Sequence, residues 1–96
     1  MTFEEAVAQH LKLLSQYVPV VDRVHGKQHP EFHQVKALWE RMAQKIHTAG
    51  TALPQLSEEF AKLREVTSDY QVPGDVCESY EAVYHMLKDL DQAYTA

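Results

Sequence analysis

The sequence predicts an all-α domain in which four helices pack as an antiparallel up-down-up-down bundle. Apolar residues recur at intervals of three and four in four segments, and no useful stretch alternates with the period of two that marks a half-buried strand. Glycines and prolines separate the segments, and short connections favour antiparallel neighbours. The 96 residues suit one small domain, so we take residues 1–96 as a single unit.

The first helix is expected to begin after Thr2, because Thr2 and Glu5 have the spacing of a capping box. Pro19 lies inside this helix and is expected to kink it, since proline removes one backbone donor and clashes with the preceding turn. Gly26 is expected to end the helix in the left-handed conformation that glycine adopts easily. The buried stripe is predicted to contain Phe3, Val7, Leu14, Tyr17, Val21 and Val24.

The next two helices are predicted from about Pro30 to Ala49 and from near Pro54 to the turn-rich stretch TSDYQVPGD. Gly50 is expected to end the first of them. The expected buried residues are Phe32, Val35, Trp39, Met42, Ile46 and Ala49, followed by Leu56, Phe60, Leu63 and Val66.

The last helix is predicted to begin at Asp75, whose carboxylate has the right spacing to accept a hydrogen bond from the amide of Glu78. Its apolar stripe has the helical period, so this segment completes the bundle. The residues expected to be buried are Val76, Tyr80, Val83, Leu87, Leu90 and Tyr94.

Charge and composition argue against nucleic-acid and membrane partners. The chain carries 9 Lys+Arg against 14 Asp+Glu, for a formal charge of −5, and its basic residues are scattered. Clustered cations that neutralise phosphates are what drives binding to nucleic acids and anionic lipids. Cys77 is the only cysteine, which excludes an intrachain disulfide, and the acidic amino terminus is unlike a signal peptide. We therefore expect a cytoplasmic protein.

The chain contains six histidines, and histidine is a common metal ligand. Carboxylate-bridged di-iron bundles use Glu-x-x-His on two helices, and this pattern is absent from the chain. His25, His29 and His33 are four residues apart, but Gly26 and Pro30 interrupt the helix between them. We expect His29 and His33 to be exposed turn and surface groups. His25 is expected either to turn inward at the corner of the bundle or to lie as a cation at the helix end.

The remaining candidate groups favour a structural interpretation. His10 lies on the apolar stripe of the first helix and is expected to be a hydrogen-bonded core or boundary residue. His85 and Asp89 have ligand spacing but lie off the stripe of the last helix, which predicts a surface pair. Cys77 is expected in the first turn of the last helix as an inert thiol, because acidic neighbours oppose its ionisation. The residues therefore do not predict an enzyme.

Two segments resemble the repair-of-iron-centres family, whose members are cytoplasmic hemerythrin-like di-iron bundles linked to restoring iron-sulfur clusters after nitrosative or oxidative damage. These segments are VVDRVHGKQHPEF and LREVTSDYQVPGDVCESYEAVYHMLKDL, which together cover close to half of the chain. The resemblance implies a hemerythrin-like fold. It also implies that His25 and His47 correspond to iron ligands of the family.

Beyond those two histidines, the family's ligand pattern is not kept. The resemblance places Glu4 where the family has a histidine and Thr51 where it has a glutamate. The histidine that opens the third helix in the family falls near Leu53 or Pro54 here, and the final pair of ligands would follow Ala96. The resemblance thus implies a shortened domain that lacks most of the iron ligands.

Two functions are compatible with these observations. The leading hypothesis is a non-catalytic binding or accessory protein, derived from the iron-sulfur cluster repair family, that holds no cofactor. It would bind a protein partner or associate with itself as a homodimer. The alternative is a metal-binding protein of cluster repair or of the nitrosative and oxidative stress response, in which His25, His47 and Glu4 hold a single iron or zinc ion.

Overall fold

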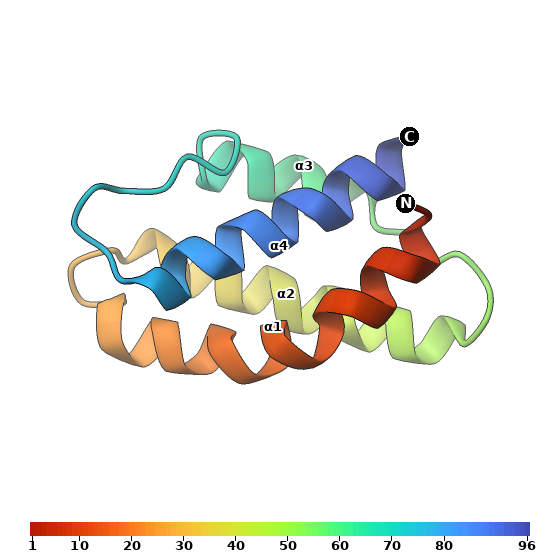
Figure 1. Cartoon of the computed structure of the whole chain (residues 1–96), viewed down its shortest axis with the longest axis horizontal. Coiled ribbons are helices and arrows are strands. Elements are labelled where there is room, and N and C mark those ends of the chain that lie inside the picture. The colour runs from red at the N-terminus through yellow and green to blue at the C-terminus, as the bar shows by residue number, and fades with distance from the viewer.

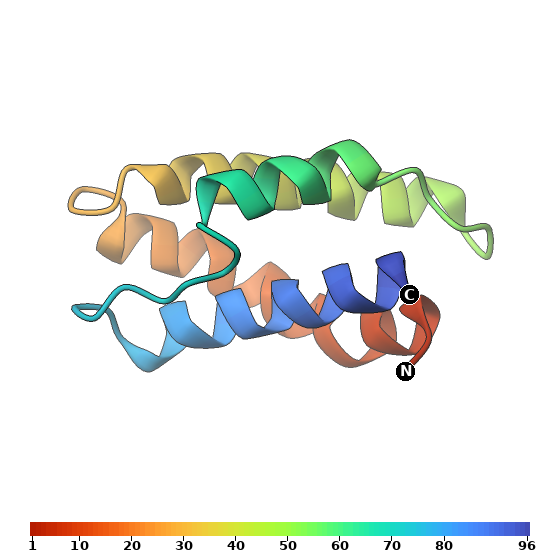
Figure 2. The same ribbon diagram turned by 90° about the horizontal axis from the view of Figure 1, so that it is seen from above.

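A computed structural model describes all residues 1–96 and confirms the all-α four-helix bundle. The helices are α1 (Phe3–His25), α2 (Glu31–Ala49), α3 (Ser57–Val66) and α4 (Glu78–Thr95). Consecutive helices run in opposite directions, and both termini lie at the same end of the bundle (Figure 1). Seen from above, α3 lies beside α2 and α4 lies beside α1 (Figure 2). None of these helices combines the length and apolar character needed to cross a membrane.

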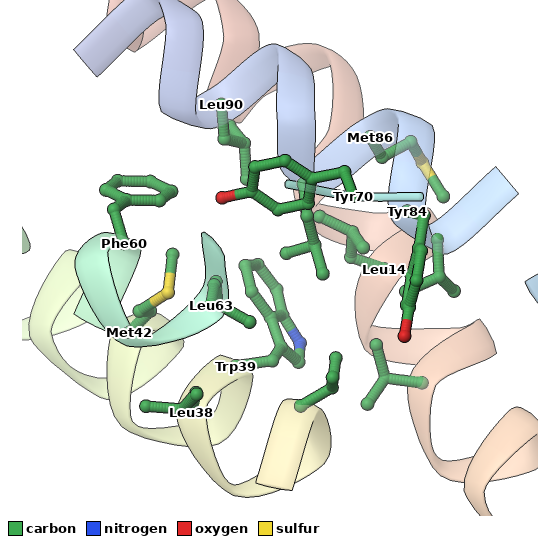
Figure 3. Packing of buried hydrophobic residues seen from close by; sticks show 14 of the residues in the cluster. Leu14, Leu38, Trp39, Met42, Phe60, Leu63, Tyr70, Tyr84, Met86 and Leu90 are labelled. Carbon is green, nitrogen blue, oxygen red and sulfur yellow. The ribbon is translucent and has the colours of Figure 1, made fainter. Parts of the chain in front are cut away.

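One hydrophobic cluster of 20 buried residues fills the space between the helices (Figure 3). Most residues of the four predicted stripes belong to it, which is expected because burial of apolar surface drives folding. Val24 does not: 63% of its surface is exposed. The largest side chains with almost no exposure include Tyr80, Tyr84, Phe32 and Phe60.

The capping box at the start of α1 is present as predicted. Thr2 Oγ1 accepts a hydrogen bond from the amide of Glu5 at 3.1 Å, and the Glu5 carboxylate accepts one from the amide of Thr2 at 2.9 Å. The helix continues through Pro19 to His25. The prediction for Gly26 was wrong, because this residue is right-handed, with φ −59°. Glycine is needed there for space, since a Cβ would collide with the backbone oxygen of Asp22 and with the ring of His33.

Gly50 ends α2 with a positive φ of 61°, as predicted. The two later helices begin further along the chain than expected: α3 begins at Ser57, and α4 begins at Glu78 with Cys77 as its N-cap residue. Asp75 therefore does not cap α4. Its carboxylate bonds instead to His29 in the connection between α1 and α2, 2.9 Å away.

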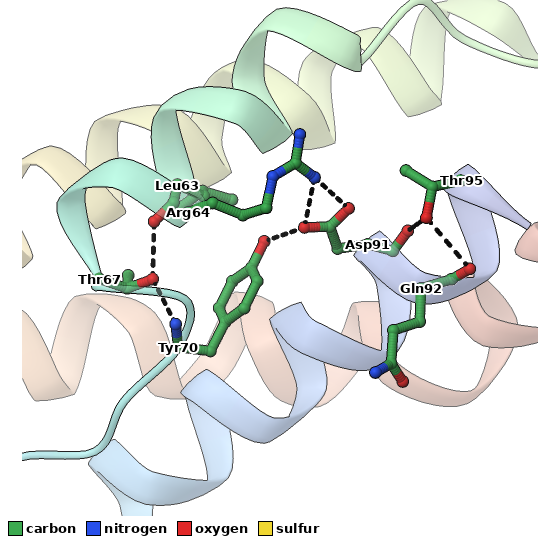
Figure 4. A network of polar contacts seen from close by, with 7 residues as sticks. All are labelled: Leu63, Arg64, Thr67, Tyr70, Asp91, Gln92 and Thr95. Carbon is green, nitrogen blue, oxygen red and sulfur yellow. Dashed lines mark hydrogen bonds and ion pairs between the residues drawn. The ribbon is translucent and has the colours of Figure 1, made fainter.

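The connection between α3 and α4 contains three consecutive residues with positive φ, namely Ser68, Asp69 and Tyr70. Such conformations are unfavourable for residues other than glycine and persist only where the surroundings hold them. Thr67 Oγ1 accepts from the amide of Tyr70 at 2.8 Å and donates to the carbonyl of Leu63 at 2.6 Å (Figure 4). The Tyr70 hydroxyl donates to the buried Asp91 carboxylate, so both ends of the turn are fixed.

Candidate functional site

His25 lies at the end of the bundle where α1 ends and α4 begins. Its Nε2 atom is 3.1 Å from the sulfur of Cys77, the N-cap residue of α4. The imidazole also meets the ring of Tyr80 edge-on, with 5.5 Å between the ring centres. His25 thus turns toward α4, in keeping with the inward placement expected at the corner of the bundle.

His29 is more enclosed than predicted. Its side chain is 14% exposed, and its two ring nitrogens lie 2.9 Å from carboxylate oxygens of Glu31 and Asp75. Its ring also packs against Tyr80, at 5.6 Å between centres. The expectation of an exposed turn residue was therefore wrong for His29, because the loop before α4 folds over it. It was correct for His33, whose side chain is 59% exposed and pairs with Asp22.

The protonated form of His29 suits this position, because only the imidazolium ion can donate to both carboxylates at once. Burial lowers the pKa of His29, but the hydrogen bonds to Glu31 and Asp75 outweigh it and raise the pKa above its usual 6.5. When protonated, His29 is therefore a charged link between the α1–α2 connection and the loop that precedes α4.

His29→Gln is expected to remove a component of stability that depends on pH. Because the folded-state pKa of His29 is raised, its contribution is fully present below pH 6.5 and is lost as the pH rises through the folded-state value. Glutamine keeps hydrogen-bonding groups but no charge. Urea unfolding from about pH 6 to about pH 9 should show a smaller loss of stability in the variant than in the original protein.

The matched control is His85→Gln, since His85 is exposed on α4 and bonds to no carboxylate. If the loss of stability over this pH range persisted in the His29→Gln variant, the link to Glu31 and Asp75 would not be its cause.

The part of the core next to His25 and His29 consists of aromatic side chains. The hydroxyls of Tyr80 and Tyr84 bond to each other at 2.9 Å, and both side chains are almost fully buried. Burial is the main cause that raises the pKa of both phenols. Phe32 packs against the two rings, with centres 5.0 and 6.4 Å away. The interior beside His25 is therefore filled by neutral aromatic side chains.

The three residues of the predicted metal site do not come together. His25 ends α1 and His47 lies near the end of α2, and the two helices are antiparallel. From Glu31 to His47 the chain rises roughly 24 Å along the helix, so the two histidines lie near opposite ends of the bundle. His47 lines a surface hollow with Ser15 and Pro19.

Glu4 is at the same end of the bundle as His47 but faces a different hollow, beside Ile46 and Gly50. Nowhere in the chain do three or more His, Cys, Asp or Glu side chains lie where they could share a metal ion. The donors of the family's di-iron centre thus have no matching set in this chain.

The other predicted polar groups are placed as follows. His10 is 8% exposed and bonds to Asp89 at 3.0 Å, so the prediction of a hydrogen-bonded boundary residue is confirmed. His85 does not pair with Asp89, because that carboxylate turns toward His10. Cys77 is exposed. Its contact with His25 was missed because the two are 52 residues apart and no local pattern joins them.

Fold and site together define a small four-helix bundle with an aromatic interior and no converging set of metal ligands. At one end, His25 and His29 join the end of α1 and the α1–α2 connection to the segment from Asp75 to Cys77, and we call this region the histidine-linked end. The chain is similar to the curated iron-sulfur cluster repair protein ScdA of Staphylococcus haemolyticus (strain JCSC1435), with 29% identity over 121 residues. The match covers 94% of this chain and 54% of that protein, so the chain spans about half the length of this relative. The resemblance to the iron-sulfur cluster repair family is thereby confirmed.

The matched region of 121 residues is longer than this chain of 96, so it includes positions that the chain lacks. This agrees with the shortening inferred from the sequence, and the bundle is compatible with a hemerythrin-like arrangement. No protein-family model matches the chain. No solved structure matches it significantly.

Proposed function

We propose that this chain is a non-catalytic binding or accessory protein of iron-sulfur cluster repair. The process is suggested by the similarity to a repair protein along almost the whole chain. The observation that carries the accessory role is that His25 lies at one end of the bundle, whereas His47 and Glu4 lie at the other end and face different hollows. A bridged pair of metal ions needs several ligands from facing helices around one point.

The packing beside His25 supports the same proposal. Phe32, Tyr80 and Tyr84 occupy the interior between α2 and α4 with at most 1% exposure, and their rings contact one another. Aromatic rings in close contact leave little room for ions and their bound water. The Nε2 atom of His25 is already in contact with the sulfur of Cys77. This end of the bundle is therefore suited to holding its helices together and presenting a fixed surface.

The proposal is tested by the recovery of a cluster enzyme damaged by nitric oxide or peroxide. Recovery is measured with this chain alone, with a full-length repair protein of the staphylococcal type alone, and with both, always in the presence of ferrous iron. We expect no recovery above the iron-only control from this chain alone. Together with the full-length protein, it should change the recovery rate.

The matched control is the same mixture with the chain unfolded by heat and then cleared of aggregates. Recovery of the enzyme by this chain alone would contradict the non-catalytic role. An unchanged rate in the mixture would contradict the accessory role.

A metal-binding role in the same process or in the stress response is the second candidate, and the contact between His25 and Cys77 favours it. Zinc is commonly bound by histidine nitrogen and cysteine sulfur, and here the Nε2 atom of His25 and the sulfur of Cys77 lie 3.1 Å apart. Two protein donors would leave the remaining positions to solvent. Metal analysis after anaerobic addition of zinc or ferrous iron tests this role. Stoichiometric metal that is lost in a His25→Ala, Cys77→Ser variant would favour it over the leading proposal.

A further inference from the structure

The surface hollow beside His47 has the properties of a small binding site. It lies between α1 and α2, and its walls include Ser15, Pro19, Trp39 and Ala43. Its volume is about 360 Å³, within the roughly 300 to 1,000 Å³ of pockets that hold small molecules. We call it the α1–α2 hollow. It has room for a small organic molecule.

Trp39 brings a free hydrogen-bond donor to this hollow. The residue is only 3% exposed, yet none of the side-chain hydrogen bonds of the protein involves its indole N–H. Buried indole N–H groups usually have a partner. Oε1 of Glu59 is the one unpartnered side-chain oxygen or nitrogen that is fully enclosed. The Trp39 nitrogen therefore reaches the hollow, and it lies on the edge of the indole that faces α1 (Figure 3).

Pro19 leaves a hydrogen-bond acceptor on the opposite wall. In a regular helix the carbonyl of Ser15 accepts from the backbone amide four residues later. Here that residue is Pro19, which has no amide hydrogen, although α1 continues through it. Both residues line the hollow. The hollow thus offers a donor from α2 and an acceptor from α1.

The charges around the hollow favour an uncharged ligand. Glu40 is the only carboxylate that lines it, and this carboxylate lies 3.4 Å from the ammonium group of Lys36 on the same helix. Neither a lysine nor an arginine lines the hollow. A bound anion would lack a partner cation and a bound cation would lack a free carboxylate, and an unpaired buried charge is costly.

We propose that the α1–α2 hollow binds a small uncharged molecule that carries a secondary amide. In a trans amide the N–H and the C=O point in opposite directions. The amide N–H can therefore donate to the carbonyl of Ser15 on α1, while the amide oxygen accepts from Trp39 on α2. Short apolar groups on the two sides of the amide would contact Val18 and Ala43. The inference does not rest on the accessory role.

The test uses the single tryptophan of the chain, whose indole N–H gives one resonance in the NMR spectrum of the nitrogen-labelled full chain. The probe is N-propylbutanamide. We expect the Trp39 resonance to shift and to saturate in the millimolar range, as suits so small a ligand. N-methyl-N-propylbutanamide has no N–H to donate, so it should bind at least about tenfold more weakly.

Pro19→Ala tests the acceptor. It returns a backbone amide that can bond to the Ser15 carbonyl within the helix. The variant should bind N-propylbutanamide about tenfold more weakly than the original chain does, since the acceptor is then occupied. Binding of the N-methyl probe should not change. Equal binding of the two probes by the original chain would overturn the proposed class of ligand.

Ala43→Leu tests the place of binding, because the larger side chain fills the hollow. It should abolish the saturable shift of Trp39. The matched control is Ala37→Leu, the same change on the same helix in a different hollow that faces α3, and it should leave binding intact. Circular dichroism checks that each variant keeps its helices.

The absence of a saturable shift in the original chain would overturn the site, and so would binding that Ala43→Leu leaves unchanged. Neither result bears on the accessory role, which the recovery assay tests without this probe.

Discussion

Arg64→Leu is expected to lower the free energy of unfolding by about 3 to 5 kcal/mol, because it would leave a buried carboxylate without its cation. Asp91 is 4% exposed, and Arg64 Nη1 donates to its two oxygens at 2.7 and 2.8 Å (Figure 4). The Tyr70 hydroxyl supplies a third hydrogen bond at 2.7 Å but no charge. Urea unfolding followed by circular dichroism at a fixed protein concentration measures the loss.

Two further variants separate this effect from a general loss of helix stability. Adding Asp91→Asn to the Arg64→Leu protein should recover part of the loss, since the amide is neutral and its oxygen can still accept from Tyr70. Lys62→Leu is the matched control, because Lys62 is half exposed and pairs with Glu65 on the surface of the same helix at 3.6 Å. It should change stability by less than about 1 kcal/mol. An equal loss in the two leucine variants would contradict the assigned role of Asp91.

We expect the loss of this ion pair to affect His25 and His29 as well. Arg64, Asp91 and Tyr70 join α3, α4 and the left-handed turn that begins their connection. The same connection carries Asp75 and Cys77 to the end of α1. Loosening the turn should therefore weaken the contacts of His25 and His29 as well, although neither histidine touches the ion pair.

Phe32→Ala is expected to cost about 3 to 5 kcal/mol, since it removes a fully buried aromatic side chain from a packed core. Phe32 contacts the rings of Tyr80 and Tyr84, so the cavity would open beside the histidine-linked end. Urea unfolding measures this loss too. A smaller loss is expected for Phe32→Leu, which leaves a smaller cavity.

The matched control is Val24→Ala, an apolar truncation at a site that is 63% exposed. It should change the free energy of unfolding by no more than about 0.5 kcal/mol. If Phe32→Ala and Val24→Ala cost the same, the interior beside His25 would not be packed as the structure has it.

The sequence predicted the number and order of the helices because periodic apolar residues and turn-forming residues are local signals. The capping box at Thr2 and the end of α2 at Gly50 were correct for the same reason. The start of α4 was predicted too early. Asp75 has suitable spacing for a helix cap, but its carboxylate bonds to His29, a residue 46 positions away. Local spacing does not show whether the Asp75 carboxylate will bond to the amide of Glu78 or to a distant side chain such as His29.

Helical periodicity also could not separate the core face of α1 from its neighbouring flank. Val24 fits the apolar repeat, yet its flank is left uncovered by α4 and remains exposed. Gly26 was predicted to be a left-handed helix cap. It is right-handed instead, and its missing side chain lets the ring of His33 lie close to its backbone. In the candidate site, the resemblance identified His25, whereas its contact with Cys77 required the packed bundle.

The helical class, the antiparallel order and the resemblance to iron-sulfur cluster repair proteins thus follow from residue patterns along the chain. The packing of the helices, in contrast, places His25 far from His47 and Glu4, encloses His29, and leaves Val20 and Val24 of α1 exposed. These are relations between side chains on different helices. They depend on how far each helix extends and on which face it turns to its neighbours.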